Sequence, residues 1–448
     1  MTGLGFLRQV RPLAWLVAAL SVLLLPTLVW AQSRPEVLTL EQAVDLALQQ
    51  QPSLRQTRAA AELARARVAI AQVPRRPTVT LYASAATGST HVRPCSNDPS
   101  VGCGGFFDPS ASTGFGAQAN WRLHDFGQTD AAVRASELSA QAVAANLDTD
   151  LLAIRTHVEV RYLEAIARHR LVAVAEATVQ SEATHLAQAR KFVVAGAKDP
   201  IEVPQAQARA ANARSALAQA RSQEAIALAN LRAAMGLFDP QRSVAVTDAW
   251  PTPPADDPPD LGALVETSRK QRPEMAQLDK EMAAAAAHLA AARAERRPVL
   301  SASASTQWGP DSNDWAPEPS WTAGLTLSWQ LFDGGRAEAN QRVAQAGVSS
   351  AQAQRDSLLV ALTSQLELAR AQISANRSNV LASTEAVGAA RAQLKLAEGR
   401  YSQGVGSQIE LTDAQTAVTT AEGNLVQAEW QVADAWAQLR RAVGEERR

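Results

Sequence analysis

The feature that most limits how this chain can fold is a heptad repeat in the stretch from Arg336 to Arg400. Apolar residues recur at steps of seven, which is typical of helices packed as a coiled coil. The heptad positions are Leu359, Leu366, Ile373, Val380, Val387 and Leu394. At ~1.5 Å per residue this helix would be roughly 100 Å long. A helix of that length cannot form the core of a compact domain, so we expect it to project from a membrane or to line an assembly.

A second long helix and a return helix after each long helix show the same pattern. The heptad residues of the first half are Leu151, Val158, Ala165, Val172, Val179 and Leu186, and those of the last helix are Leu411, Val418, Leu425, Val432 and Leu439. Aromatic residues are only 5% of the chain, and much of the 46% hydrophobic content is alanine. Alanine favours helix and buries little surface. The composition therefore predicts thin, closely packed helices rather than large aromatic cores.

The chain contains two structural repeats. The segment NWRLHDFG, from Asn120 to Gly127, matches SWQLFDGG, from Ser328 to Gly335, and the same spacing holds through the following helices. The spacing changes once, upstream of Trp121, which indicates a single insertion in the first repeat. Register kept over so long a stretch is strong evidence for repeated structural units.

These patterns divide the chain into four parts. We expect a secretory signal at 1–31, a first repeat at 32–238, a proline-rich linker at 239–260 and a second repeat at 261–448. The linker contains six prolines, which excludes a continuous helix there.

Each repeat is predicted to run as a helix, a β-hairpin, a long helix and a return helix. The first helices should span Leu40 to Gln72 and Leu261 to Arg296, and the hairpins 77–124 and 298–332. Thr39 is the expected N-cap of the first helix, with Gln42 in the capping-box position.

The N-terminus has the layout of an export signal. Arg8 and Arg11 precede an apolar run from Leu13 to Val29, and small residues surround a cut after Ala31. The alternative is an uncleaved membrane anchor. The expectation is therefore a mature protein outside the cytoplasm.

The segment from Trp321 to Leu331 alternates between apolar and polar residues, with the length and pattern of a membrane β-strand. Weaker versions occur at Thr78–Gly88, Thr113–Leu123 and Val299–Trp308. Five of the ten tryptophans lie in or beside these stretches, where interfacial aromatic girdles would place them. The alternative is a soluble hairpin with one buried face.

Four strands cannot close a barrel, for which about eight are needed. Open strand edges in lipid would leave backbone groups unpaired. Several chains must therefore share one barrel if these strands lie in a membrane. The residues alone do not choose between two chains and three.

The mature chain resembles the TolC family of outer-membrane efflux proteins from LTLEQAVDLALQQQPSL to AWAQLRRAVG. The most specific matches are the two interhelix turns, RKFVVAGAKDPIEVPQAQ and RYSQGVGSQIELTDAQ. The resemblance implies an α+β membrane protein in the outer membrane of a Gram-negative bacterium. Its homotrimer would form a 12-stranded β-barrel, four strands per chain, continued by a long coiled-coil α-helical barrel in the periplasm.

The resemblance also implies partners and a function. The trimer would be the passive outer-membrane channel of a tripartite efflux or type I secretion system. Gly196 and Gly404, at the two hairpin-tip turns, would lie where a periplasmic membrane-fusion adaptor makes contact. An inner-membrane pump of the RND, ABC or MFS type would supply the energy.

The resemblance further assigns a periplasmic gate to Glu410 and Asp413, whose carboxylates threefold symmetry would gather around one axis. An ordinary charged pair at a solvated helix start is the alternative. The entrance latch would be Glu202 with Tyr401. A basic residue of the family's second turn falls on Gly406 here, so part of the closing network would be missing.

Other chemistry is weakly represented. Cys95 and Cys103 lie in the inserted segment of an exported chain, which predicts a local disulfide. No phosphate-binding motif, hydrolytic triad or histidine ligand spacing is present in the sequence, so we expect no enzyme activity, cofactor or metal. The net charge of −1 gives no support to nucleic-acid binding.

Two rival functions use the same features. One is an exported coiled-coil scaffold without a pore, and the other is an exported enzyme carried on a helical stalk. The alternating strand from Trp321 to Leu331 counts against the scaffold, and no segment remains for a compact enzyme domain. The cargo cannot be read from the sequence.

Overall fold

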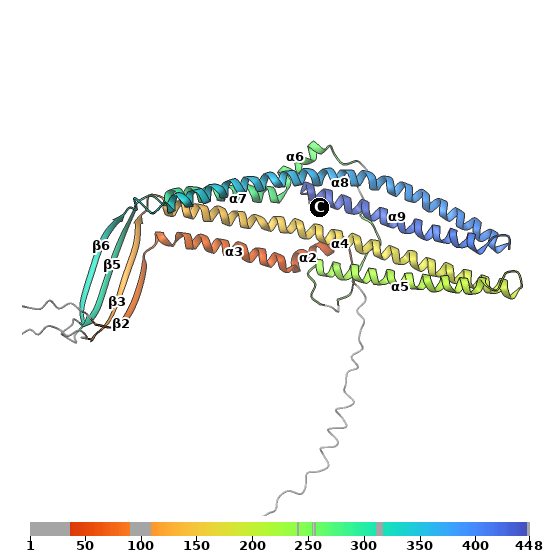
Figure 1. Cartoon of the computed structure of the whole chain (residues 1–448), viewed down its shortest axis with the longest axis horizontal. Coiled ribbons are helices and arrows are strands. Elements are labelled where there is room, and N and C mark those ends of the chain that lie inside the picture. Colours follow the sequence, from red (N-terminus) through yellow and green to blue (C-terminus); the bar gives the residue numbers. More distant parts are fainter. Residues whose placement is uncertain are drawn as a thin grey trace, which may run out of the picture.

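The computed structural model describes residues 36–89, 109–239, 242–252, 254, 257–310 and 317–445. A single β-sheet forms one end of the molecule, and helices extend from it to two hairpin tips at the other end (Figure 1). The predicted signal, 1–31, and the predicted disulfide between Cys95 and Cys103 lie outside the described residues.

The sheet is antiparallel, with strand order β2-β3-β5-β6, so the hairpins of the two repeats join through β3 and β5. Alternate residues share a face, and the register places one apolar set across all four strands. Its larger members are Val79, Leu81, Phe115, Trp121, Leu300, Trp308, Trp321, Leu325 and Leu327. The opposite face carries serine, threonine, glutamine and glycine. The strands are β2 (Thr78–Ser89), β3 (Pro109–His124), β5 (Val299–Pro310) and β6 (Pro317–Ser328).

The expected strand from Trp321 to Leu331 is wrong at its C-terminal end, because β6 stops at Ser328. Ser328 pairs with Val299, the first residue of β5, and the chain before Val299 is Pro298. Proline has no N–H to donate to a ladder, so residues beyond Ser328 have no partner strand. Trp329 instead donates its indole N–H to the Arg296 carbonyl oxygen, at 3.1 Å.

Two helices of 67 residues, one from each repeat, run from the sheet to the hairpin tips (Figure 1). Near the sheet the neighbours are α3, α4, α7 and α8, and near the tips they are α5, α4, α9 and α8. Each row has α8 at one edge. The long helices are α4 (Gln128–Val194) and α8 (Arg336–Ser402), the return helices are α5 (Glu202–Ala234) and α9 (Gln408–Val443), and the shorter partners are α3 (Pro52–Gln72) and α7 (Pro273–Ala294).

The first helix of each repeat, expected to be continuous, is in fact two helices. α2 (Leu40–Gln50) is separated from α3 at Gln51, and α6 (Leu261–Gln271) is separated from α7 at Arg272. Gln51 and Arg272 are extended, with ψ of 121° and 123°, because a following proline disfavours the helical conformation. The N-terminal capping box is confirmed: Gln42 N donates to Thr39 Oγ1, and Thr39 N donates to Gln42 Oε1.

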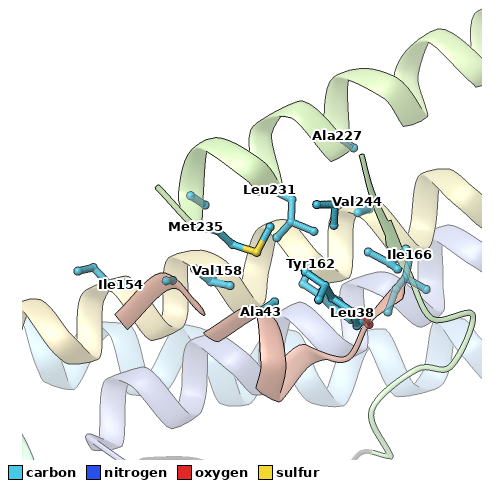
Figure 2. Close-up of a cluster of buried hydrophobic side chains, with 14 of the residues drawn as sticks. Leu38, Ala43, Ile154, Val158, Tyr162, Ile166, Ala227, Leu231, Met235 and Val244 are labelled. Atoms are coloured by element: carbon cyan, nitrogen blue, oxygen red, sulfur yellow. Dashed lines mark hydrogen bonds between the residues drawn. The ribbon is translucent and has the colours of Figure 1, made fainter. Parts of the chain in front are cut away.

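A short parallel pair was not expected. β1 (Glu36–Leu38) pairs with β4 (Val244–Val246), so the predicted linker contains a strand. The pair covers a buried cluster in which Tyr162 donates its hydroxyl to the Leu38 carbonyl oxygen at 2.8 Å (Figure 2). Strands of three residues are too short to show an alternating pattern.

The heptad residues face the contacts between the helices, where they are buried or half-buried. Leu366 and Ile373 of α8 pack with Val432 and Leu439 of α9, and Val387 packs with Val418 nearer the tips. The buried apolar residues in the described ranges form separate clusters along the helices, as expected for a long, thin protein.

Candidate functional site at the hairpin tips

Each hairpin tip is a short turn between a long helix and its return helix. Gly196 follows α4 with φ of 69°, and Gly404 follows α8 with φ of 80°. Glycine adopts this left-handed conformation without steric cost, which is why it commonly ends helices. The return helices begin differently: Asp199 Oδ1 accepts from Ile201 N at 2.9 Å, whereas Ser407 Oγ accepts from Glu410 N at 3.1 Å.

The residues of the predicted latch lie together. Tyr401 donates its hydroxyl to Glu202 Oε2 at 2.8 Å, which joins the end of α8 to the start of α5. The Tyr401 side chain is buried, and Phe192 lies edge-on to its ring. Burial raises the pKa of Tyr401 to about 12, with further contributions from the hydrogen bond to Glu202 and from its negative charge. The phenol therefore stays protonated and donates to the carboxylate.

Two more hydrogen bonds join the hairpins around this pair. Lys198 Nζ donates to the Gly406 carbonyl oxygen at 2.9 Å and lies 5.3 Å from the centre of the Tyr401 ring. Gln408 Nε2 donates to the Glu202 carbonyl oxygen at 3.2 Å. The sequence did not identify Lys198, because its partner is a backbone atom of the other repeat.

Gly406 is where the chain departs from the TolC pattern, and the turn there is tight. A Cβ atom built on Gly406 would lie 2.8 Å from Tyr401 N and 3.0 Å from Arg400 C. A side chain would therefore move the turn away from Tyr401. Position 406 has no basic side chain. Lys198, from the first turn, instead places its ammonium group at the Gly406 carbonyl oxygen.

The predicted gate residues lie on the first turns of α9. Glu410 pairs with Arg400, with 3.3 Å between Oε1 and Nε. Asp413 is exposed and makes no ion pair with any residue that the structure describes. The two carboxylates are therefore not equivalent: one has a cation beside it, and the other faces solvent. The sequence did not identify Arg400 as a partner.

Farther from the tips than the latch, the contact between α4 and α9 is polar. Thr178 and Thr419 are joined by a hydroxyl hydrogen bond of 3.0 Å, and Ser181 donates to Gln415 Oε1 at 2.8 Å. The contact between α8 and α9 in the same region has an apolar centre, with an ion pair between Arg391 and Glu422 at its exposed side. The contact between the two hairpins of one chain is therefore more polar in this region than the contact between the two helices of the second hairpin.

The described residues contain no group of histidine, cysteine, aspartate and glutamate side chains that could hold a metal ion. Among the helices that the structure describes, none has an apolar stretch long enough for a membrane span.

The family model described as "Outer membrane efflux protein" matches residues 43–237 and 264–445. The chain belongs to this family. Together the two matched segments cover most of both repeats, including both hairpin tips. The expected resemblance to TolC-like outer-membrane efflux proteins is thereby confirmed.

Individual relatives agree with this assignment. Protein CyaE of Bordetella pertussis is 30% identical over 308 residues, which are 67% of this chain and 62% of that protein. The chain thus matches less than two thirds of the length of that relative.

Solved structures support the fold. A membrane protein from Pseudomonas aeruginosa superimposes with a TM-score of 0.76 at 24% identity, over 90% of each chain. The Campylobacter jejuni CmeC outer membrane channel superimposes with a TM-score of 0.76 at 17% identity, over 90% of this chain and 85% of that one. The predicted fold class, a small β-sheet continued by long coiled-coil helices in two repeats, is confirmed.

Proposed function

We propose that this outer-membrane efflux protein works as a homotrimeric, passive exit duct of a tripartite efflux or type I secretion system. Cargo would enter at the helical tips in the periplasm, pass through a helical tunnel and leave through a 12-stranded barrel. The observation that best supports the proposal is the open sheet, which has one apolar face, one polar face and two unpaired edges.

The sheet edges favour assembly with other copies. β2 and β6 each pair on one side only. In lipid, unpaired N–H and C=O groups cost several kcal/mol each, and a barrel removes such edges. Three copies would supply twelve strands, which leave an interior wide enough for water, with the polar face toward it.

The helices at the edges of each row also expose apolar side chains that another copy of the chain could cover. On α8, exposed apolar residues lie on the side away from its packed face. They are Val343, Val360, Leu368, Leu381 and Leu396. α3 and α5, at the other edges of the two rows, also expose apolar residues, namely Leu63, Ile70 and Ile226. Contact of α8 with α3 and α5 of a second copy would bury both sets.

The tips suit the role of an entrance. Glu410 and Asp413 would form the periplasmic gate, since three copies would bring six carboxylates around one axis and favour cations. The hydrogen bond between Tyr401 and Glu202 would hold the two hairpins of each chain in the closed arrangement. Lys198 would add a second connection.

Adaptor contact is proposed at the turns of Gly196 and Gly404. Four exposed apolar residues surround these glycines: Val194, Ile201, Val405 and Ile409. Exposed apolar groups clustered at the end of an otherwise polar projection are typical of a protein-binding surface. The adaptor would connect the duct to an RND, ABC or MFS pump, and the pump would choose the cargo.

Planar-bilayer recording tests the proposal. The purified protein should run as a heat-modifiable trimer on a gel and give cation-selective conductance. Glu410→Ala with Asp413→Ala should raise the conductance or reduce its cation selectivity, whereas Glu398→Ala, an exposed carboxylate on α8, should change neither. A protein without bilayer conductance would support the alternative of a non-pore scaffold. Unchanged conductance and selectivity in the double variant would contradict the gate assignment.

A further inference from the structure

The apolar face of the sheet has a hollow toward the end nearest the helices. The hollow has a volume of about 490 Å³. Its lining includes Pro77, Ala119, Trp121, Ala302, Ala323 and Leu325. The strand residues among them come from β3, β5 and β6 and share the apolar face, and Pro77 stands immediately before β2.

The hollow exists because small side chains meet there. Ala304 lies opposite Ala119 on one neighbouring strand and opposite Ala323 on the other. Alanine ends at its Cβ atom, so the floor stays low while Trp121 and Leu325 rise on either side. The result is a narrow apolar groove rather than a flat surface.

Other copies of the chain would leave the groove uncovered. Strand pairing between copies would use the outer edges of β2 and β6, whereas the groove is centred on β5, between β3 and β6. An inference about its occupant rests on the proposed function, since the apolar face meets lipid only if the sheet lies in a membrane.

The end of the groove nearest the helices has the features of a membrane interface. Trp121 donates its indole N–H to the Arg75 carbonyl oxygen at 3.2 Å, which fixes the segment that leads into Pro77. Tryptophan prefers the headgroup level of a bilayer. Arg75 pairs with Asp130 at 2.5 Å, whereas Arg76 is exposed and forms no ion pair with a described residue.

The nearby carboxylates do not compete for Arg76. Asp125 Oδ2 accepts from Thr129 N at 2.9 Å, and its Oδ1 accepts from Gly127 N at 3.1 Å. Asp130 is held by Arg75. Arg76 directly precedes Pro77 of the lining, so its cation is within side-chain reach of this end of the groove and is complementary to a phosphate.

We propose that the groove binds one acyl chain of an anionic phospholipid, with the headgroup phosphate at Arg76. The chain would lie over the alanine floor between Trp121 and Leu325. The lipid would belong to the leaflet on the helix side of the sheet, and each protomer would carry one such site.

Native mass spectrometry of the full-length trimer tests the site, with phosphatidylglycerol and phosphatidylcholine of equal acyl chains as probes. Ala304→Leu should lower lipid retention by about tenfold, because leucine occupies the space of about two methylene groups of the lipid. Ala83→Leu, the same change on the same face outside the groove, should retain lipid as the wild type does. Equal retention in the two variants would overturn the acyl-chain site.

The headgroup contact is tested separately. Arg76→Gln should lower the preference for phosphatidylglycerol over phosphatidylcholine by about fivefold, as expected for one interfacial cation. Arg67→Gln, an exposed arginine farther along α3, should leave the preference unchanged. Loss of preference in both variants, or in neither, would overturn the role of Arg76.

Conductance of the same preparations separates the two proposals. A conducting trimer that retains no phosphatidylglycerol would contradict the lipid site and leave the duct supported. A trimer that retains lipid in the groove but gives no conductance would contradict the duct and support the lipid site.

Discussion

The Tyr401 phenol is the residue on which the contact between the two hairpins is centred. Its hydrogen bond to Glu202 could be predicted from the resemblance, which assigned both residues to one latch. The contacts of Lys198 and Arg400 could not, because each depends on how a turn places atoms that are distant in sequence or on another helix. The sequence thus identifies the functional residues of the hairpin tips better than it identifies the side chains and backbone atoms that they contact.

The raised pKa of Tyr401 gives a prediction about pH. A phenol whose folded pKa is about 12, against an ordinary value of 10.0, contributes stability that is fully present below pH 10 and is lost as pH rises through about 12. A pH titration followed by tyrosinate absorbance should therefore show a phenol that ionises near pH 12. Tyr401→Phe should remove this component. Tyr82→Phe, which removes a phenol from the sheet, should keep that component. Its persistence in Tyr401→Phe would contradict the assignment.

The Asp125 carboxylate gives a prediction at low pH. Burial disfavours its ionised form, but hydrogen bonds from Thr129 and Gly127 outweigh burial and lower its pKa below 3.8. Its stabilising effect is present above that value and is lost as pH falls through the lower, folded pKa. Asp125→Ala should cost about 1 kcal/mol, typical for a helix cap, when measured by thermal unfolding at pH 7. The difference from wild type should shrink at acid pH, and a constant difference would argue against the cap.

Helix and strand identity followed from periodicity where the pattern was long. The heptads predicted α4 and α8, and the alternation predicted the four strands of the sheet. The errors lie at boundaries: Pro52 and Pro273 divide two predicted helices, and β6 loses its partner after Ser328. The pair of strands β1 and β4 was not predicted, because three residues are too few to show a period. The two strands are also far apart in the sequence.

The second turn should respond to a single methyl group. Gly406→Ala would place Cβ against the backbone of Tyr401 and Arg400, so the turn must shift and weaken the hydrogen bond to Glu202. We expect a higher resting conductance in planar bilayers. Gly399→Ala is the matched control, since a Cβ there meets nothing within 4 Å. Equal conductance of the two variants would show that the tightness of the turn does not matter.

The whole molecule could be predicted as part of an assembly, because neither the helices nor the strands bury both of their sides within one chain. The number of copies came from the resemblance, since edge counting permits two or three.

The exposed apolar side of α8 makes the assembly testable. Leu381→Asp should place a charge in the proposed contact and remove the trimer band on a gel. Ala386→Asp, at an exposed position about 140° around α8 from Leu381, should preserve it, and a trimer in both variants would contradict this contact.

The order α5, α4, α9, α8 at the tips has a consequence for how a ring of three chains would respond to force. Six junctions between hairpins would surround the axis, and they would alternate between two kinds. Three would lie inside a chain, where Tyr401 meets Glu202 and where a covalent tether limits how far the partners can drift. Three would lie between chains, formed by α8 and α5 without such a tether. The two kinds of junction in such a ring can separate independently. A partner that separates only one kind would therefore open the entrance incompletely.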